Sequence, residues 1–190
     1  MIKIFYMIKA AYILAGGKSS RMGEDKGLKL LHGKPLIQYV IDSLIPCFPE
    51  IKISTNNQEY EKFGYELVAD SIPEKGPMGG IYAALKNSSY DDIFITGCDM
   101  PCISASSFER LLQQKNQSAT VVVYNERIQP LFGIYNRNLI PLMETKIEQN
   151  KLKMIDFLQE AGATFIEMDN EDVFLNINTL EDFKHLENKE

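Results

Sequence analysis

The segment from Gly16 to Lys26 (GGKSSRMGEDK) combines three glycines with three basic side chains, those of Lys18, Arg21 and Lys26. Glycines allow a tight turn whose backbone N–H groups face an anion, and the basic side chains supply positive charge. Neither common phosphate loop fits the segment. A Walker A loop here would need a glycine at position 12, which is tyrosine, and the G-x-G-x-x-G motif fails because position 18 is lysine. The segment therefore predicts an anion-binding loop of another kind.

The charge of the chain is distributed unevenly. Its 190 residues include 20 basic and 26 acidic ones, a net charge of −6, and the 45% of hydrophobic residues is typical of a globular protein. The acidic balance argues against general nucleic-acid binding, which requires an excess of lysine and arginine. Residues 16–35 nevertheless hold five basic and two acidic residues, so their net charge is +3 and that of the other residues is −9. We therefore expect a small anionic ligand at this segment.

Two aspartates stand where strands are expected to end. Asp99 follows the apolar run Ile93–Thr96, and Asp70 follows Glu66–Ala69. A carboxylate in this position can bind Mg²⁺, which takes one or two carboxylates and completes its shell with water and phosphate oxygens. Either residue could equally be a turn or helix-capping aspartate. The run 76–80 (GPMGG) fits a close approach of the backbone to a ligand at a helix N-terminus, and it fits an ordinary tight turn equally well.

Four asparagines flank predicted elements: Asn56, Asn57, Asn176 and Asn178. The first two follow a predicted strand, and the other two precede the last predicted helix. Thr179 with Asp182 satisfies a capping box, which explains Thr179 without a further role. The cap does not explain Asn176 and Asn178. Turn formation and ligand contact stay open for all four asparagines.

Short β-rich apolar runs alternate with segments of helical period, and we find no internal repeat. The predicted strands are Ala10–Leu14, Ile51–Ser54, Glu66–Ala69, Ile93–Thr96, Ala119–Tyr124, Leu131–Tyr135 and Thr164–Met168. The predicted helices are Pro35–Leu44, Gly79–Lys86, Ser104–Gln114, Leu139–Gln149, Leu152–Glu160 and Leu180–Glu187. A Gly-Pro break is expected before the second helix, Ser104 as the N-cap of the third, and a turn at Asn125–Gln129.

This alternation predicts an α/β fold with three Rossmann-like layers, in which helices cover both faces of a mostly parallel mixed sheet. Such folds bind ligands beyond the C-terminal ends of their strands. Residues 16–26, 70–80 and 99–101 follow three predicted strands. We therefore expect these segments to line one cleft.

The length of the chain predicts a single domain over residues 1–190, with residues 1–9 as an N-terminal extension. Cys47, Cys98 and Cys102 are odd in number, and none is spaced C-x-x-C, so we expect buried free thiols in a reducing cytosol. The start of the chain does not fit a signal peptide, and no stretch is apolar enough to cross a membrane. We expect a cytoplasmic protein. Met22, Met78 and Met100 are expected to pack rather than to bind a ligand.

The ordered motifs of the chain resemble those of the molybdenum cofactor guanylyltransferases, which belong to the wider superfamily of nucleotidyltransferases that handle sugar nucleotides. The resemblance covers residues 10–187 and is carried by LAGG (14–17), RMG (21–23), DK (25–26), GKPL (33–36), DS (70–71), GPMGG (76–80), CDMP (98–101) and NINT (176–179). The opening motif alone indicates a nucleotidyltransferase, and the full ordered set is more specific. The chain departs from the family pattern at Gly79, where alanine is common, and at Cys102, where a larger apolar or aromatic residue is frequent. Neither departure removes a charged group.

The resemblance implies transfer of GMP from GTP to the molybdenum-carrying molybdopterin, with release of pyrophosphate. It implies that GTP is bound by Leu14, Ala15, Gly16, Gly17, Lys26, Asn56, Asp70 and Asp99. It implies that Arg21, Lys26 and Asp99 are catalytic, that Asp99 binds Mg²⁺, and that Gly79, Asn176 and Asn178 contact the pterin substrate. The spacing to Asp70 leaves the choice between Asn56 and Asn57 open.

The two small-molecule substrates, GTP and the molybdopterin cofactor, are thus the expected partners, together with transient contacts to other proteins of cofactor biosynthesis. No nucleic acid or membrane is expected. One alternative is a related transferase that uses CTP or a sugar phosphate, although cytidylyl relatives more often have Ala-Ala-Gly at 15–17 and lack the Asp25-Lys26 pair. Another is a non-catalytic nucleotide sensor, which the presence of Arg21, Lys26 and Asp99 argues against.

Overall fold

The structure is a computed structural model that describes residues 8–16, 25–100 and 105–168. Within these ranges seven strands form one sheet in the order β5-β4-β1-β6-β8-β7-β9. The strands are β1 Ala10–Leu14, β4 Glu50–Ser54, β5 Glu66–Val68, β6 Asp92–Gly97, β7 Ala119–Tyr124, β8 Arg127–Asn136 and β9 Thr164–Glu167. β8 is antiparallel to both of its neighbours, and the other pairings are parallel. The sheet is therefore mixed and mostly parallel, as predicted.

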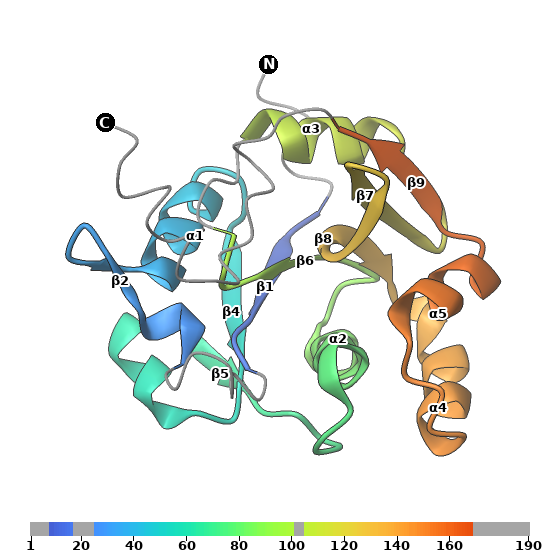
Figure 1. The fold of residues 1–190 in the computed structure, drawn as a ribbon, viewed down its shortest axis with the longest axis horizontal. Helices are drawn as coiled ribbons and strands as arrows, with labels where there is room; N and C mark the ends of the chain where they lie inside the picture. The colour runs from blue at the N-terminus through green and yellow to red at the C-terminus, as the bar shows by residue number, and fades with distance from the viewer. Residues whose placement is uncertain (1–7, 17–24, 101–104, 169–190) are drawn as a thin grey trace.

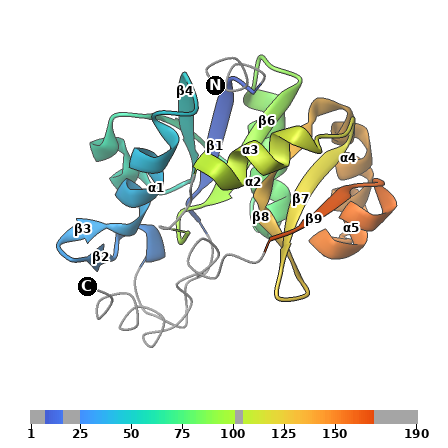
Figure 2. The same ribbon diagram turned by 90° about the horizontal axis from the view of Figure 1, so that it is seen from above.

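Helices cover both faces of the sheet (Figures 1 and 2). One face packs against α1 (Leu36–Leu44) and α3 (Ala105–Gln113), and the other packs against α2 (Gly76–Asn87), α4 (Ile140–Glu148) and α5 (Met154–Glu160). Alternate residues along each strand point to opposite faces, so a buried strand supplies both cores. The three-layer α/β fold predicted from the sequence is thus confirmed.

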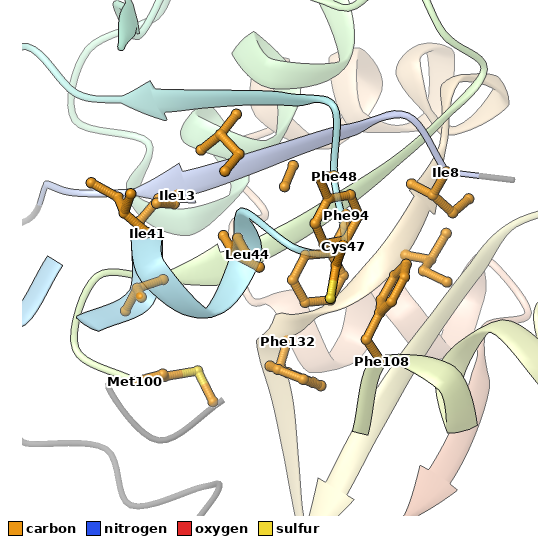
Figure 3. Packing of buried hydrophobic residues seen from close by; sticks show 14 of the residues in the cluster. Ile8, Ile13, Ile41, Leu44, Cys47, Phe48, Phe94, Met100, Phe108 and Phe132 are labelled. Carbon is orange, nitrogen blue, oxygen red and sulfur yellow. The ribbon is translucent and has the colours of Figure 1, made fainter. Parts of the chain in front are cut away.

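Four aromatic rings form the centre of the core on the α1 and α3 face (Figure 3). The ring of Phe48 lies 5.2 Å from that of Phe94 and 4.5 Å from that of Phe108, measured between centroids. The rings of Phe94 and Phe132 meet edge to face at 5.2 Å. Met100, the residue after Asp99, is also buried in this cluster. Packing of Met100 therefore attaches the segment that carries Asp99 to the core.

The strand register explains why the functional segments meet. Leu14 pairs with both Ser54 and Gly97, and Ser54 pairs with Val68. The four parallel strands β5, β4, β1 and β6 thus end at the same level of the sheet. Whatever follows each strand emerges at this one edge, which we call the carboxyl edge.

Two predicted features have the wrong bounds. α2 begins at Gly76 rather than after a break before Gly79. The first turn of a helix does not use the backbone N–H that proline lacks, so Pro77 fits into this turn instead of interrupting the helix. The turn between β7 and β8 is shorter than predicted: it needs only Asn125 and Glu126, both with positive φ, and β8 already begins at Arg127. The predicted helix 180–187 and the Ser104 cap lie outside the described residues.

Short elements that the sequence did not predict lie between β1 and α1, between β4 and β5, and between β8 and α4. They are the hairpin of β2 (Leu30–Leu31) with β3 (Lys34–Pro35) and the 3₁₀ turns η1 (Lys26–Leu28), η2 (Gln58–Phe63) and η3 (Arg137–Leu139). His32 and Gly33 both have positive φ, as a two-residue hairpin turn requires. These elements become important because η1 and η2 lie beside the carboxyl edge.

Other sequence expectations can be compared with the described residues. Ile8 is fully buried, and the carbonyl of Lys9 accepts a hydrogen bond from Glu50 N–H at 3.2 Å, so the last two residues of the expected extension pack against the domain. Cys47 and Cys98 are buried free thiols, as predicted, and Met78 is buried. Cys102 and Met22 lie outside the described residues. None of the described helices is long and apolar enough to cross a membrane.

Candidate active site

A cavity of about 560 Å³ opens at the carboxyl edge, and its size suits a small ligand. It is bounded by residues that follow β1, β4 and β5, by the first turns of α2 and by one residue of β8. The lining residues are Leu14, Gly16, Ser54, Asn56, Asp70, Glu74, Gly76, Pro77, Gly80 and Leu131. Two of the three segments expected to share a cleft, those that begin at residues 16 and 70, thus meet in what we call the first cavity.

Ser54 lines the first cavity, and its hydroxyl is buried without a partner among the described residues. Ser54 ends β4 and is almost fully buried, and its Oγ has no hydrogen-bond partner among the described residues. A buried hydroxyl without a partner is costly unless a ligand or water satisfies it. Ser54 is therefore a candidate ligand contact that the sequence reasoning missed, because a serine at a strand end has no distinguishing spacing.

The two adjacent asparagines after β4 point in different directions. Asn56 lines the first cavity, and its Oδ1 accepts a hydrogen bond from the backbone N–H of Asp70 at 3.0 Å. Asn57 instead directs its side-chain Nδ2 to Asp25 at 3.1 Å and accepts from Glu59 N–H at 3.0 Å. The geometry therefore favours Asn56 over Asn57 as the residue on the ligand side.

The Asp70 carboxyl group lies in the wall of the first cavity, and burial raises its pKa above the usual aspartate value. Its charged form is therefore less stable in the folded protein than in the unfolded chain. Such a group contributes stability that is present below the unfolded-state pKa of about 3.9 and is lost as the pH rises through the folded-state pKa. An ionised Asp70 at neutral pH thus costs stability, which is a common property of ligand-binding groups.

Asp70→Asn is accordingly expected to stabilise the fold at pH 7 by ~1 kcal/mol and to lower kcat/KM for the nucleotide by about tenfold. Thermal unfolding at pH 7 and pH 4 checks the first effect, whose size should shrink at the lower pH because wild-type Asp70 takes up its proton there. Asp42→Asn is the control of opposite sign, since a hydrogen bond from Lys34 lowers the pKa of Asp42. A destabilised Asp70→Asn protein at pH 7 would contradict the assignment.

Helix α2 approaches β1 closely at Gly80. A Cβ at this position would lie 3.0 Å from Leu14 Cδ2 and 3.7 Å from Asp70 Oδ1, so a larger residue would press on the wall of the first cavity. Gly79, the predicted substrate-binding glycine, faces elsewhere: a Cβ there would meet Lys75 Cβ at 2.9 Å. Gly79 lines neither cavity described here, and its contact with substrate stays a prediction.

The backbone at the end of β1 forms hydrogen bonds to both neighbouring strands next to the first cavity. The carbonyl of Leu14 accepts from Cys98 N–H at 3.1 Å, and the N–H of Ala15 donates to the carbonyl of Ser54 at 2.9 Å. Ala15 is fully buried, whereas Leu14 and Gly16 on either side of it line the first cavity. Gly17, the next residue of the motif, lies outside the described residues.

Lys26 and Asp99 are brought together from distant parts of the sequence. Lys26 begins η1 and Asp99 follows β6, and Lys26 Nζ lies 3.4 Å from Asp99 Oδ2. Both side chains are largely buried. A predicted phosphate-binding cation and a predicted metal-binding carboxylate therefore share one place, as nucleotidyl transfer requires.

A second cavity of about 430 Å³ adjoins the first. Asp99 forms part of its wall, together with residues of β8 and of the α5 N-terminal region. The lining residues are Pro77, Asp99, Gln129, Pro130, Leu131, Leu152, Lys153, Met154 and Ile155. Pro77 and Leu131 line both cavities, so these two residues separate two neighbouring compartments.

The donor groups on this edge fit a divalent cation that is shared with a ligand. Among the described residues no group of three or more His, Cys, Asp or Glu side chains could hold a metal ion alone. Mg²⁺ needs only one or two carboxylates when phosphate oxygens and water complete its shell. Asp99 supplies one such carboxylate, so the residues suit a cation that arrives with a nucleotide rather than a site built from protein alone.

The basic side chains of residues 16–35 do not all lie at the candidate site. Lys34 forms an ion pair with Asp42 of α1 and lies over the ring of Tyr39 at 4.2 Å, so it stabilises the β2–β3 hairpin. Lys26 instead faces Asp99. Lys18 and Arg21 lie outside the described residues, as do Asn176 and Asn178. The catalytic role of Arg21 and the substrate contacts of the two asparagines stay predictions.

The residues that β8 supplies could not be found from the sequence. β8 runs antiparallel to β6, with Phe132 paired to Thr96, so its early residues Gln129, Pro130 and Leu131 reach the carboxyl edge. A strand pattern predicts neither the partner nor the direction of a strand. Pro130 is the one local signal, because proline within a strand marks an irregular or special position.

The fold and this edge define an α/β protein of the nucleotidyltransferase class: a mostly parallel sheet with a ligand-sized cavity, a cation and a carboxylate at the ends of its parallel strands. The model of the MobA-like NTP transferase domain matches residues 11–163. The chain belongs to this family.

Curated relatives match over almost the whole chain. A molybdenum cofactor guanylyltransferase from Vibrio atlanticus is 38% identical, with 90% of this chain and 91% of the relative covered. One from Haemophilus influenzae is 35% identical, with 92% and 95% covered. Among solved structures, the molybdopterin-guanine dinucleotide biosynthesis protein A of Archaeoglobus fulgidus has a TM-score of 0.80 at 25% identity, with 94% of this chain and 96% of that one covered.

Proposed function

We propose that this protein is a molybdenum cofactor guanylyltransferase, which transfers GMP from GTP to the molybdenum-carrying molybdopterin and releases pyrophosphate. Full-length relatives that carry this name support the proposal. The single structural observation that carries it is the pairing of Lys26 with Asp99, whose carboxylate lies in the wall of the second of two adjoining cavities. A transferase with two anionic substrates needs two compartments that meet at a site of charge neutralisation.

We assign the nucleotide to the first cavity and the pterin substrate to the second. Leu14, Gly16, Asn56 and Asp70, all predicted to bind GTP, line the first cavity. Ser54 lines it as well, and its hydroxyl has no partner among the described residues. Asp99 lies in the wall of the second. The α-phosphate of the nucleotide would then lie where the cavities adjoin, between its own binding site and the acceptor.

The reaction places demands on the chain that these residues can meet. An oxygen of the terminal phosphate of molybdopterin forms a bond to the α-phosphorus of GTP, and the bond from that phosphorus to the pyrophosphate oxygen breaks. The attacking phosphate is already ionised, so no general base is needed. Lys26, and Arg21 as predicted from the sequence, would stabilise the negative charge on the departing pyrophosphate. Asn56 and Asp70 would hold the nucleoside in line for attack.

Asp99 would hold Mg²⁺ together with phosphate oxygens of the nucleotide. When bound, the ion neutralises charge and polarises the α-phosphate. In the free protein the ammonium of Lys26 lies beside this carboxylate and compensates its charge. Substrate binding would thus exchange a protein ion pair for contacts to phosphate and metal.

Pyrophosphate release measured with each of the four NTPs, with and without molybdenum-loaded molybdopterin, tests the proposal. We expect release that requires GTP, the acceptor and Mg²⁺, and that stops when the metal is chelated. Equal release with CTP, or none with GTP, would contradict a guanylyltransferase. GTP binding without release in the presence of acceptor and metal would instead identify a nucleotide sensor.

A further inference from the structure

A partly buried hydrogen-bond network holds the residues on either side of Lys26. Asp25 Oδ1 accepts hydrogen bonds from the hydroxyl of Tyr60 at 2.5 Å and from the backbone N–H of Gly27 at 3.1 Å. Asp25 Oδ2 accepts from Asn57 Nδ2 at 3.1 Å. The carboxylate thus receives three hydrogen bonds from groups with fixed positions, an arrangement that leaves it little freedom.

The two donor side chains come from a separate element and are themselves held in place. Asn57 caps η2, with its Oδ1 accepting from Glu59 N–H, and its own N–H donates to Thr55 Oγ1 at 3.1 Å. Tyr60 is fully buried. Burial, above all, raises the pKa of the Tyr60 phenol, so the hydroxyl keeps its proton and acts as the donor to Asp25.

Gly27 is confined on the opposite side of Lys26. A Cβ at Gly27 would lie 2.4 Å from the Tyr60 hydroxyl oxygen and 3.1 Å from both Cβ and Sγ of Cys98. Gly27 therefore fits between Tyr60 and the residue next to Asp99. With Asp25 and Gly27 both fixed, the backbone of Lys26 is fixed as well, and its side chain extends to Asp99.

We propose that Tyr60 and Asn57 are positioning residues that fix Lys26 opposite Asp99 through Asp25. In the free protein they hold the Lys26 backbone in place. In catalysis, a role that rests on the proposed function, they present the ammonium to the phosphates without a cost of ordering it during the reaction. The sequence reasoning treated Asn57 only as an alternative to Asn56 and gave Tyr60 no role.

The first experiment needs no nucleotide. The rate at which an acylating reagent modifies Lys26 is measured by mass spectrometry, with Lys115 of the same molecule as internal reference, since Lys115 forms a comparable pair with Asp92 at 2.9 Å. Tyr60→Phe removes one hydroxyl and keeps the ring. We expect it to raise the Lys26 rate by about fivefold relative to Lys115, as loss of one hydrogen bond shifts a local opening equilibrium. An unchanged ratio would overturn the proposal.

A matched variant separates this effect from the general loss of a tyrosine hydroxyl. Tyr82 also donates its hydroxyl to a carboxylate, Glu144 Oε1 at 2.8 Å, on the far side of α2. Tyr82→Phe should leave the Lys26 rate unchanged.

Asn57→Asp supplies a second, independent variant. It keeps the acceptor that caps η2 but replaces the donor to Asp25 with a repelling carboxylate. It should raise the Lys26 rate at least as much as Tyr60→Phe.

The second experiment tests the catalytic consequence. Tyr60→Phe should lower kcat/KM for GTP by about tenfold, while the double variant with Lys26→Met should be no less active than Lys26→Met alone. Losses that multiply in the double variant would show that Tyr60 does not act through Lys26, and would overturn this part of the proposal. If wild-type protein releases no pyrophosphate, the proposed function fails, whereas the acylation ratio still decides whether the network fixes Lys26.

Discussion

Asp99→Asn is expected to lower kcat for GMP transfer by about 10³-fold, or ~4 kcal/mol of transition-state stabilisation. The substitution preserves the shape of the side chain and removes the carboxylate that pairs with Lys26 and lines the second cavity. Binding of GTP should be weakened much less than turnover, because the charge that the metal neutralises increases as the bond to pyrophosphate breaks. Initial rates of pyrophosphate release at saturating substrates, with Mg²⁺ varied, provide the measurement.

The strand that leads to Asp99 also contains a matched control. Asp92 begins β6 and pairs with Lys115, and the exposed fractions of these two side chains, 20% and 21%, are close to the 19% and 24% of Asp99 and Lys26. Asp92→Asn removes a carboxylate of similar burial, with a lysine partner, at the opposite end of the strand. It should change kcat by less than about twofold. Similar losses for both variants would indicate that Asp99 acts through the stability of β6 rather than at the reacting phosphate.

Much of the sheet could be predicted from the sequence because its strands carry local signals. The strand β1 over 10–14 was predicted with the observed bounds, since its apolar run ends at Gly16. The predicted start of helix α2 is three residues too late, because Gly76 and Pro77 were interpreted as a break although proline suits a first turn. The order of the strands and the reversed direction of β8 depend on tertiary pairing, which no local pattern contains.

Some residues of the candidate site also carry local sequence signals, and others do not. Lys26, Asp70 and Asp99 stand next to glycine-rich or strand-end segments, so residue type and position made them candidates, and the resemblance to the family implied their roles. Ser54 and Tyr60 could not be selected. The significance of Ser54 lies in a buried hydroxyl that has no partner in the described part of the chain, and that of Tyr60 in a hydrogen bond to a residue 35 positions away. Such properties exist only once the chain is folded.

Lys26→Met is expected to lower kcat/KM for GTP by about 10²-fold, or ~3 kcal/mol. Methionine keeps a flexible apolar chain of similar length, so the change removes the ammonium with little loss of packing. Lys26→Arg retains the positive charge but not the compact shape of the ammonium, and it should recover about tenfold of the loss. Initial rates over a range of GTP concentrations separate the effect on kcat from the effect on KM, and an unchanged kcat/KM would contradict the phosphate contact.

The division of this loss between kcat and KM identifies which phosphate Lys26 serves. If the ammonium contacts the pyrophosphate that departs, its interaction is stronger in the transition state than with bound GTP, because negative charge builds up on the leaving oxygen. The loss should then fall mainly on kcat. A loss confined to KM would instead mean that Lys26 binds GTP and the transition state equally well. Lys115→Met, which breaks the Asp92 pair at the far end of β6, is the matched control and should change neither constant by more than about twofold.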